Sequence, residues 1–115
     1  NPESLAATIV GTSVADLSAH LLVVKQGIDA GKTFQLQEGD NVIGRDGGDI
    51  SLSDPSVSRA HAVIRRSGDD FIIGDLGSRA NTLVDGERVT GIAVKGGDVI
   101  TLGQTKIVIM GPQPS

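Results

Sequence analysis

The feature that most constrains the fold is a series of short apolar segments that fills the chain from Leu21 to Met110. Each segment is rich in Val, Ile, Leu or Thr and is bounded by Gly, Asp, Asn or Pro, a pattern typical of strands joined by tight turns. No stretch of this region has the spacing of an amphipathic helix. The sequence therefore predicts an all-β domain with strands at 21–26, 33–37, 41–44, 50–52, 60–66, 70–75, 82–84, 88–89, 92–94, 99–102 and 106–110.

Alternation within these segments indicates strands with one buried face. Phe34 and Leu36 alternate with polar residues, so both are predicted to face the core. Ile107 and Ile109 are predicted to face inward as well, with Val108 facing outward. Many short strands at close spacing predict a sandwich of two sheets.

Glycine marks the predicted turns. The chain has 16 glycines, and Gly39, Gly68 and the pair 96–97 fall where the chain must reverse, some of them at positive φ. Asp85-Gly86 is the clearest hairpin signal, because both positions of a two-residue β-turn favour these residue types.

Composition limits the class of function. A chain of 115 residues with 38% hydrophobic content fits one compact domain. The net charge of -4 argues against diffuse attraction to nucleic acid or to an anionic membrane, so an anion site must be local. The absence of cysteine excludes disulfides and thiolate metal sites, and we expect neither a metal nor a cofactor. A chain without cysteine fits a reducing compartment, so a cytoplasmic domain is the default expectation. No apolar run approaches the roughly 20 residues that a spanning helix needs.

The local composition of the sequence divides the chain into three parts. Residues 1–19 are small and polar with scattered aliphatic residues, and we expect a flexible arm. Residues 20–110 form the predicted domain. Residues 111–115 read Gly-Pro-Gln-Pro-Ser, which predicts a linker or tail.

Three separate breaks between predicted strands carry donors that suit a phosphate group. Arg45 supplies a planar charged fork, Ser58 a short neutral donor, and the stretch 78–82 a loop amide that can hold a peptide backbone. A sandwich could bring these breaks together at one end. Donors of these kinds favour a binding site over a catalytic site. Half of the Lys and Arg residues lie between Arg45 and Arg79, although such a cluster could also be a solvated face.

Five motifs follow one another in order between residues 44 and 103. They are Gly44-Arg45-Asp46, Ile50-Ser51-Leu52, Asp54-Pro55-Ser56-Val57-Ser58-Arg59-Ala60-His61-Ala62, Asp75-Leu76-Gly77-Ser78 and Gly97-Asp98-Val99-Ile100-Thr101-Leu102-Gly103. The ordered set resembles the forkhead-associated (FHA) domain in its bacterial form, over about residues 20–110. The resemblance implies an eleven-stranded β-sandwich of two sheets whose loops at one end bind phosphothreonine in an extended segment of a partner.

The resemblance also implies roles for single residues. Arg45 and Ser58 match the residues of the family that bind the phosphate. His61 matches a histidine that supports the serine loop from within, and it is not expected to act as an acid or base. Gly44 would let the backbone turn tightly so that Arg45 points outward, or it is a plain turn glycine. His20 is expected to have no special role.

One departure from the family pattern concerns the loop after Ser78. The family has Asn-Gly-Thr where this chain has Ala80-Asn81-Thr82, so Ala80 holds the asparagine position. In the family that asparagine bonds the peptide main chain beside the phosphothreonine. Asn81 could replace it only if the loop shifts register, for instance with Asn81 in the left-handed conformation of the missing glycine.

Further donors flank these positions. Arg59 and Arg79 could add positive charge toward the phosphate or toward acidic residues of the peptide, or they could be exposed without a role. Ser78 is predicted to be an additional donor to the phosphopeptide. No metal ligands or catalytic residues are predicted.

Three classes of function are weighed on this basis. The leading hypothesis is a phosphothreonine-dependent binding module in serine/threonine kinase signalling, with a kinase or its substrate as partner. The alternative is a scaffold or oligomerisation domain in which phosphopeptide recognition is weakened or lost, as Ala80 suggests. An enzyme is the least favoured class, because no nucleophile elbow or phosphate-cradling loop is present. In a variant of the first hypothesis, phosphorylated Thr8 or Thr12 of the arm binds the domain itself or a neighbour, which would give self-association.

Overall fold

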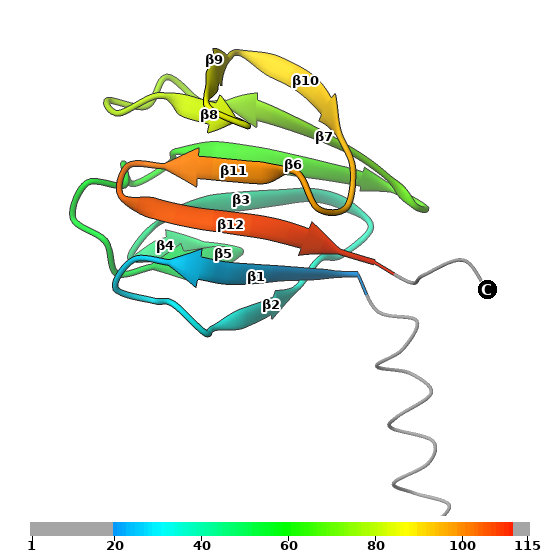
Figure 1. Ribbon diagram of the computed structural model, residues 1–115, viewed down its shortest axis with the longest axis horizontal. Helices are drawn as coiled ribbons and strands as arrows, with labels where there is room; N and C mark the ends of the chain where they lie inside the picture. Colours follow the sequence, from blue (N-terminus) through cyan, green and yellow to red (C-terminus); the bar gives the residue numbers. More distant parts are fainter. Residues whose placement is uncertain (1–19, 112–115) are drawn as a thin grey trace, which may run out of the picture.

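The computed structural model of the chain describes residues 20–111, a region built of strands and turns. One sheet has six strands in the order β2-β1-β12-β11-β8-β9, and the other has five in the order β10-β7-β6-β3-β5 (Figure 1). The predicted all-β, eleven-stranded sandwich is therefore confirmed. The strands of the two sheets are β1 (Leu21–Gln26), β2 (Thr33–Gln35), β3 (Gly39–Arg45), β5 (Ile50–Leu52), β6 (Ala62–Ser67), β7 (Asp70–Asp75), β8 (Thr82–Val84), β9 (Glu87–Val89), β10 (Gly91–Val94), β11 (Val99–Leu102) and β12 (Thr105–Met110).

The region also contains a short strand that the sequence pattern did not predict. β4 (Gly47–Gly48) lies between β3 and β5 in the chain, and a pair of glycines has no side-chain pattern by which to recognise it. A second difference concerns β6, which begins at Ala62 and not at residue 60. Residues 60 and 61 belong instead to the loop that leads into this strand.

The predicted turn glycines are confirmed. Gly39, Gly68 and Gly97 all have positive φ. In the β8–β9 hairpin Asp85 has φ 49° and Gly86 has φ 89°, which is the conformation that a two-residue turn between twisted strands requires.

Strand register brings several connections to one end of the sandwich. Ile43 of β3 pairs with Ala62 of β6, and Ala62 pairs with Asp75 of β7. β5 runs parallel to β3 and ends on the same side. The end of β3 and the loops 53–61 and 76–81 therefore meet, at the left of the molecule in Figure 1.

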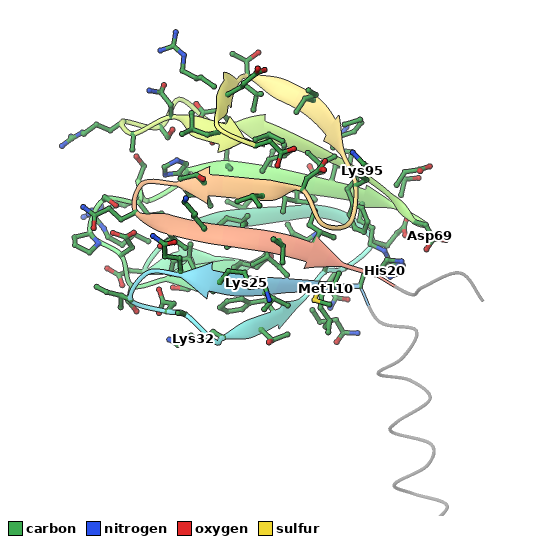
Figure 2. The ribbon with its side chains drawn as sticks, viewed as in Figure 1. His20, Lys25, Lys32, Asp69, Lys95 and Met110 are labelled. Carbon is green, nitrogen blue, oxygen red and sulfur yellow. The ribbon has the colours of Figure 1, made fainter. Side chains whose placement is uncertain are left out.

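The first and last described residues lie at the opposite end of the sandwich, where His20 is buried. Its Nε2 lies 2.7 Å from Asp69 Oδ1 (Figure 2). The centroid of its ring lies 5.7 Å from that of Phe71. His20 was expected to have no special role, and the structure corrects this: the ring joins the start of β1 to the β6–β7 turn. The contact spans 49 residues of sequence, so no local pattern could reveal it.

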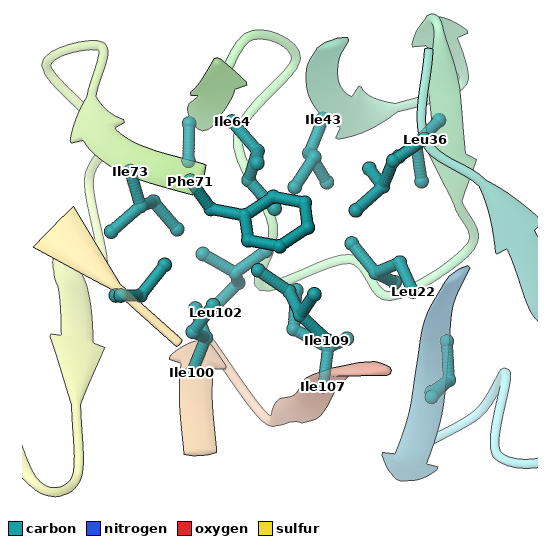
Figure 3. Close-up of a cluster of buried hydrophobic side chains, with 14 of the residues drawn as sticks. Leu22, Leu36, Ile43, Ile64, Phe71, Ile73, Ile100, Leu102, Ile107 and Ile109 are labelled. Carbon is teal, nitrogen blue, oxygen red and sulfur yellow. The ribbon is translucent and has the colours of Figure 1, made fainter. Parts of the chain in front are cut away.

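The core consists mainly of branched aliphatic side chains from both sheets (Figure 3). Burying each such side chain contributes about 1.5–3 kcal/mol relative to exposure. Val108 lies on the outer face, between Val23 and Val99 in the register, yet it is only 9% exposed. The largest fully buried side chains are Leu22, Leu36, Ile43, Ile50, Leu52, Ile64, Ile73, Ile100, Leu102, Ile107, Ile109 and His61.

Candidate functional site

A hollow of about 440 Å³ opens at the end of the sandwich where the three connections meet. We call it the loop hollow. Three of its lining residues are arginines and none is acidic, so the hollow favours an anion. Its lining residues are Arg45, Pro55, Ser56, Val57, Ser58, Arg59, Arg79 and Ala80.

Arg45 enters the hollow from the last position of β3. Its Nη1 donates to Pro55 O at 3.0 Å, and its backbone N–H donates to Ser58 O at 3.0 Å. The guanidinium forms no ion pair with the acids of the described chain, and the nearby Asp49 instead accepts from Val42 N–H. Since a guanidinium has five N–H donors, most of them remain available to a ligand.

Gly44 has a different role from the one the sequence suggested. Its φ is not positive, and β3 passes through it without turning. A Cβ at this position would lie 1.7 Å from Arg59 O, a separation that no two non-bonded heavy atoms tolerate. Glycine is therefore required so that the loop carrying Ser58 and Arg59 can approach β3 closely.

His61 connects the loops that form the hollow and is fully buried. Its Nδ1 accepts the backbone N–H of Ser58 at 3.1 Å, so the hydrogen of the neutral ring is on Nε2, which donates to Asn81 O at 2.8 Å. The backbone N–H of His61 also donates to Ile43 O. One residue thus fixes the serine loop and the loop 76–81 relative to β3, through its side chain and its backbone.

The hydroxyl of Ser58 has one partner within the described chain. Ser58 Oγ accepts the backbone N–H of Arg79 at 3.0 Å. This bond uses an acceptor site of the oxygen and leaves the hydroxyl hydrogen available to donate. Ser58 is consequently set up as a donor at the wall of the hollow.

Two buried or half-buried aspartates hold the loops, and sequence reasoning missed both roles. Asp54 accepts from the backbone and hydroxyl of Ser56, from Gln104 N–H and from the hydroxyl of Thr105. Burial alone would raise the pKa of Asp54, but these hydrogen bonds outweigh it and lower the pKa below its ordinary value. The 54–58 loop is thereby tied to the β11–β12 turn, about 50 residues away in the chain.

Asp75 plays the same part for the loop 76–81. Its carboxylate accepts from the backbone N–H groups of Gly77 and Ser78 and from the hydroxyls of Ser78 and Thr82. Here too burial raises the pKa of Asp75, while the hydrogen bonds from Ser78 and Thr82 lower it by more. An aspartate followed by Gly and Ser at these spacings is the available sequence signal for such a turn.

The predicted site residues separate into two groups. Arg45, Ser58, Arg59 and Arg79 line the same hollow. Ser78 does not line the hollow, and its hydroxyl donates to Asp75.

Asn81 belongs to the second group. It has φ 67°, the left-handed conformation that the family's glycine would adopt at this place, and Ala80 occupies the wall of the hollow. Asn81 is not among the lining residues of the hollow, and its positive φ is the conformation that a glycine would adopt most easily.

Other site types find no support in residues 20–111. No three His, Cys, Asp or Glu side chains of this region gather closely enough to hold a metal ion. Nor does this part of the chain include a helix that is long and apolar enough to cross a membrane.

Comparison with known proteins gives several relatives. Residues 23–113 match a family described as the cytoplasmic domain of the inner membrane component of T3SS. The oxoglutarate dehydrogenase inhibitor of Corynebacterium jeikeium is 40% identical over 91 residues, which cover 78% of this chain and 63% of that protein. The glycogen accumulation regulator GarA of Mycolicibacterium smegmatis is 39% identical over 95 residues, which cover 81% of this chain and 60% of that protein. The chain therefore spans less than two thirds of the length of these two relatives.

Solved structures agree with these matches. A structure from an analysis of phosphothreonine-dependent FHA domain interactions has a TM-score of 0.75 and 36% identity, covering 84% of this chain and 100% of the other. The FHA domain of FhaA, solved in complex with the intracellular domain of Rv3910, has a TM-score of 0.73 and 35% identity, covering 80% of this chain and 100% of the other. The motifs, the sandwich and these relatives together show that the chain belongs to the forkhead-associated domain family.

Proposed function

We propose that this domain binds phosphothreonine-containing segments of other proteins and that Arg45 and Ser58 hold the phosphate. The observation that carries the proposal is that these residues, one from the end of β3 and one from the loop 53–61, line one hollow with two further arginines and no acid. The site is a binding site, and the domain is not an enzyme. A relative studied for phosphothreonine-dependent interactions supports the same reading.

The chemistry of the hollow suits a phosphate monoester. At neutral pH the group carries a charge of about -1.5 to -2 and three acceptor oxygens. The free edge of the Arg45 guanidinium can bind two of these oxygens side by side, and the hydroxyl of Ser58 can donate to the third. Because the backbone N–H of Arg79 already occupies Ser58 Oγ from one side, the hydroxyl loses little freedom when the ligand binds.

Arg59 and Arg79 add charge at the rim of the hollow. Both are exposed and form no ion pair within the described chain. Each exposed charge contributes modestly and is screened by salt, so these residues should speed association more than they tighten the complex. We therefore assign the phosphate to Arg45 and Ser58, and a steering role to Arg59 and Arg79.

Ala80, which lines the hollow, affects how strongly a peptide binds. Ala80 stands at the family's asparagine position and has no side-chain group that could bond the peptide main chain, and Asn81 does not line the hollow. Losing one such bond typically costs about 0.5–1.5 kcal/mol, which weakens binding without abolishing it. This feature also supports the second candidate function, a scaffold domain with reduced phosphopeptide recognition.

The partner is a protein phosphorylated on threonine, either a serine/threonine kinase or one of its substrates. Relatives named as an inhibitor and as a regulator favour a regulatory role in signalling. Thr8 and Thr12 of the arm are candidate internal ligands, although residues 1–19 lie outside the described region. If either acts in this way, phosphorylating the arm will lower the affinity for an added phosphopeptide or change the oligomeric state.

The test is a titration of paired peptides, each in a phosphothreonine form and an unphosphorylated form, by isothermal calorimetry. We expect binding of the phosphorylated forms only, with loss of binding in Arg45→Ala and Ser58→Ala. Arg88→Ala is the matched control, because Arg88 is an exposed arginine of β9 outside the hollow. Equal affinity for both forms of every peptide would favour the scaffold.

A further inference from the structure

β10 is an open edge of the five-stranded sheet (Figure 1). Its strand partner is β7, and the backbone N–H of Asp75 donates to Thr90 O at 2.9 Å in the same register. In an antiparallel pair, alternate residues direct both backbone groups to the partner strand. Counting from Thr90, the N–H and C=O groups of Gly91 and Ala93 point away from β7, toward the open edge.

β10 lacks the charged residues and proline by which proteins often protect an edge. Its sequence Gly-Ile-Ala-Val contains neither charge nor proline, and Ile92 is 44% exposed. The other edges differ, since β9 has Glu87 and Arg88 and both β2 and β5 are only three residues long. An apolar strand with unpaired backbone groups is a site for pairing with another strand.

We propose that β10 is the contact through which two copies of this chain pair, antiparallel about a two-fold axis. Gly91 of each copy then lies opposite Ala93 of the other, and these residues exchange backbone hydrogen bonds. Ile92 faces Ile92 of the second copy, which covers part of its exposed side chain. The two five-stranded sheets become one continuous sheet.

Symmetry favours a second copy over an unrelated strand as the occupant. A two-fold contact must be complementary to itself, and an uncharged strand centred on one isoleucine satisfies this condition. The edge strand β9, which precedes β10 in the chain, carries one acid and one base, Glu87 and Arg88, so it adds no net charge that would oppose the contact. No residue of β9 or β10 lines the loop hollow, so both hollows remain open in the dimer.

The dimer has a consequence for binding. Two loop hollows on one particle would bind two phosphorylated segments of the same partner with an affinity above that of one hollow. The pairing itself does not rest on the proposed function, because it needs no ligand.

A single-cysteine experiment tests the register directly. The chain contains no cysteine, so Ile92→Cys introduces one thiol on each copy. Residues directly opposite across antiparallel strands have Cβ atoms about 4.5–5.5 Å apart, close enough for a disulfide after small movements. We expect mild oxidation to link Ile92→Cys into dimers at least about tenfold faster than Ile72→Cys. Ile72 is a matched control, because it is 52% exposed on β7, one strand in from the edge.

Sedimentation velocity supplies an independent test. We expect the wild type to dimerise as its concentration rises toward about 1 mM, since small contacts bind weakly. Ile92→Lys and Ile92→Glu should each be monomeric, and mixing them should restore the dimer, which excludes misfolding as the cause. Ile72→Lys should behave as the wild type.

Three results would overturn the proposal: a wild type that is monomeric throughout, a dimer that Ile92→Lys leaves unchanged, or equal crosslinking of the two cysteine variants. The phosphopeptide titration reports separately on the loop hollow. A dimer that binds no phosphopeptide would contradict the proposed function alone.

Discussion

The backbone at Gly44 and the carbonyl of Arg59 approach so closely that a Cβ on residue 44 would lie 1.7 Å from Arg59 O. This approach allows the backbone N–H of Arg45 to donate to Ser58 O at 3.0 Å. The two residues proposed to hold the phosphate are thus linked through the backbone, and their spacing depends on the missing side chain at position 44.

Gly44→Ala should therefore disrupt the site. The methyl group forces the loop away from β3, and overpacking of this kind typically costs about 1–3 kcal/mol. We expect a lower free energy of unfolding in urea and loss of phosphopeptide binding in calorimetry. Gly47→Ala is the control, because a Cβ there meets no atom within 4 Å and Gly47 is not at positive φ. Wild-type affinity in Gly44→Ala would contradict this account.

His61→Phe tests whether the buried ring supports the hollow. Phenylalanine keeps the ring but removes both nitrogens, so the backbone N–H of Ser58 and the carbonyl of Asn81 lose their partners. Each unsatisfied buried group costs about 1–3 kcal/mol. We expect lower stability in denaturant and weaker phosphopeptide binding while the β-sheet signal in circular dichroism remains. Unchanged affinity in a folded variant would show that the ring does not position Ser58.

The sandwich could be predicted largely from local patterns. The strands at 21–26, 50–52, 70–75, 82–84 and 99–102 have the bounds expected from alternation and turn residues. β4 could not be predicted, since its two glycines carry no pattern. Alternation correctly places the side chain of Val108 on the outer face of the sheet. It does not predict that this side chain is nearly buried, because its exposure depends on the neighbouring strands.

The residue types of the site could be predicted from the sequence. The residues that hold the site in place were harder to predict. Arg45 and Ser58 stand in recognisable motifs, and the structure brings them to one hollow. The roles of Asp54 and His20 depend on partners about 50 residues away in the chain, which no local spacing reveals. Glycine is required at position 44 because the backbone of another loop approaches it closely. The sequence alone cannot distinguish this requirement from that of a turn.

Asp75 makes stability depend on pH in a defined direction. Its pKa is lowered in the folded state from the usual value of 3.8, so its stabilising contribution is fully present above pH 3.8 and is lost as the pH falls through the lower folded value. Asp75→Asn should reduce the free energy of unfolding near pH 6 by about 1–3 kcal/mol. The difference from wild type should shrink below pH 3.8.

Urea unfolding at a series of pH values checks this expectation. Asp70→Asn is a suitable control, because Asp70 is an exposed acid of the same strand whose side chain makes no hydrogen bond within the described residues. The assigned role would be contradicted if the free energies of unfolding of Asp75→Asn and wild type differed by the same amount from pH 6 to pH 3. This pH range spans the ordinary carboxylate pKa of about 4.

Ala80→Asn should restore the contact that the family pattern contains and this chain lacks. Asn81 already holds the left-handed backbone, with φ 67°, so the new side chain would stand in the wall of the hollow without a change of register. One added hydrogen bond to the peptide main chain is worth about 0.5–1.5 kcal/mol, so we expect roughly 2- to 10-fold tighter binding of a phosphothreonine peptide in calorimetry. Ala80→Asp is the control, because it has nearly the same shape but places a negative charge beside the phosphate and should weaken binding. If Ala80→Asn binds no tighter than wild type, the loop hollow does not hold the peptide main chain beside residue 80.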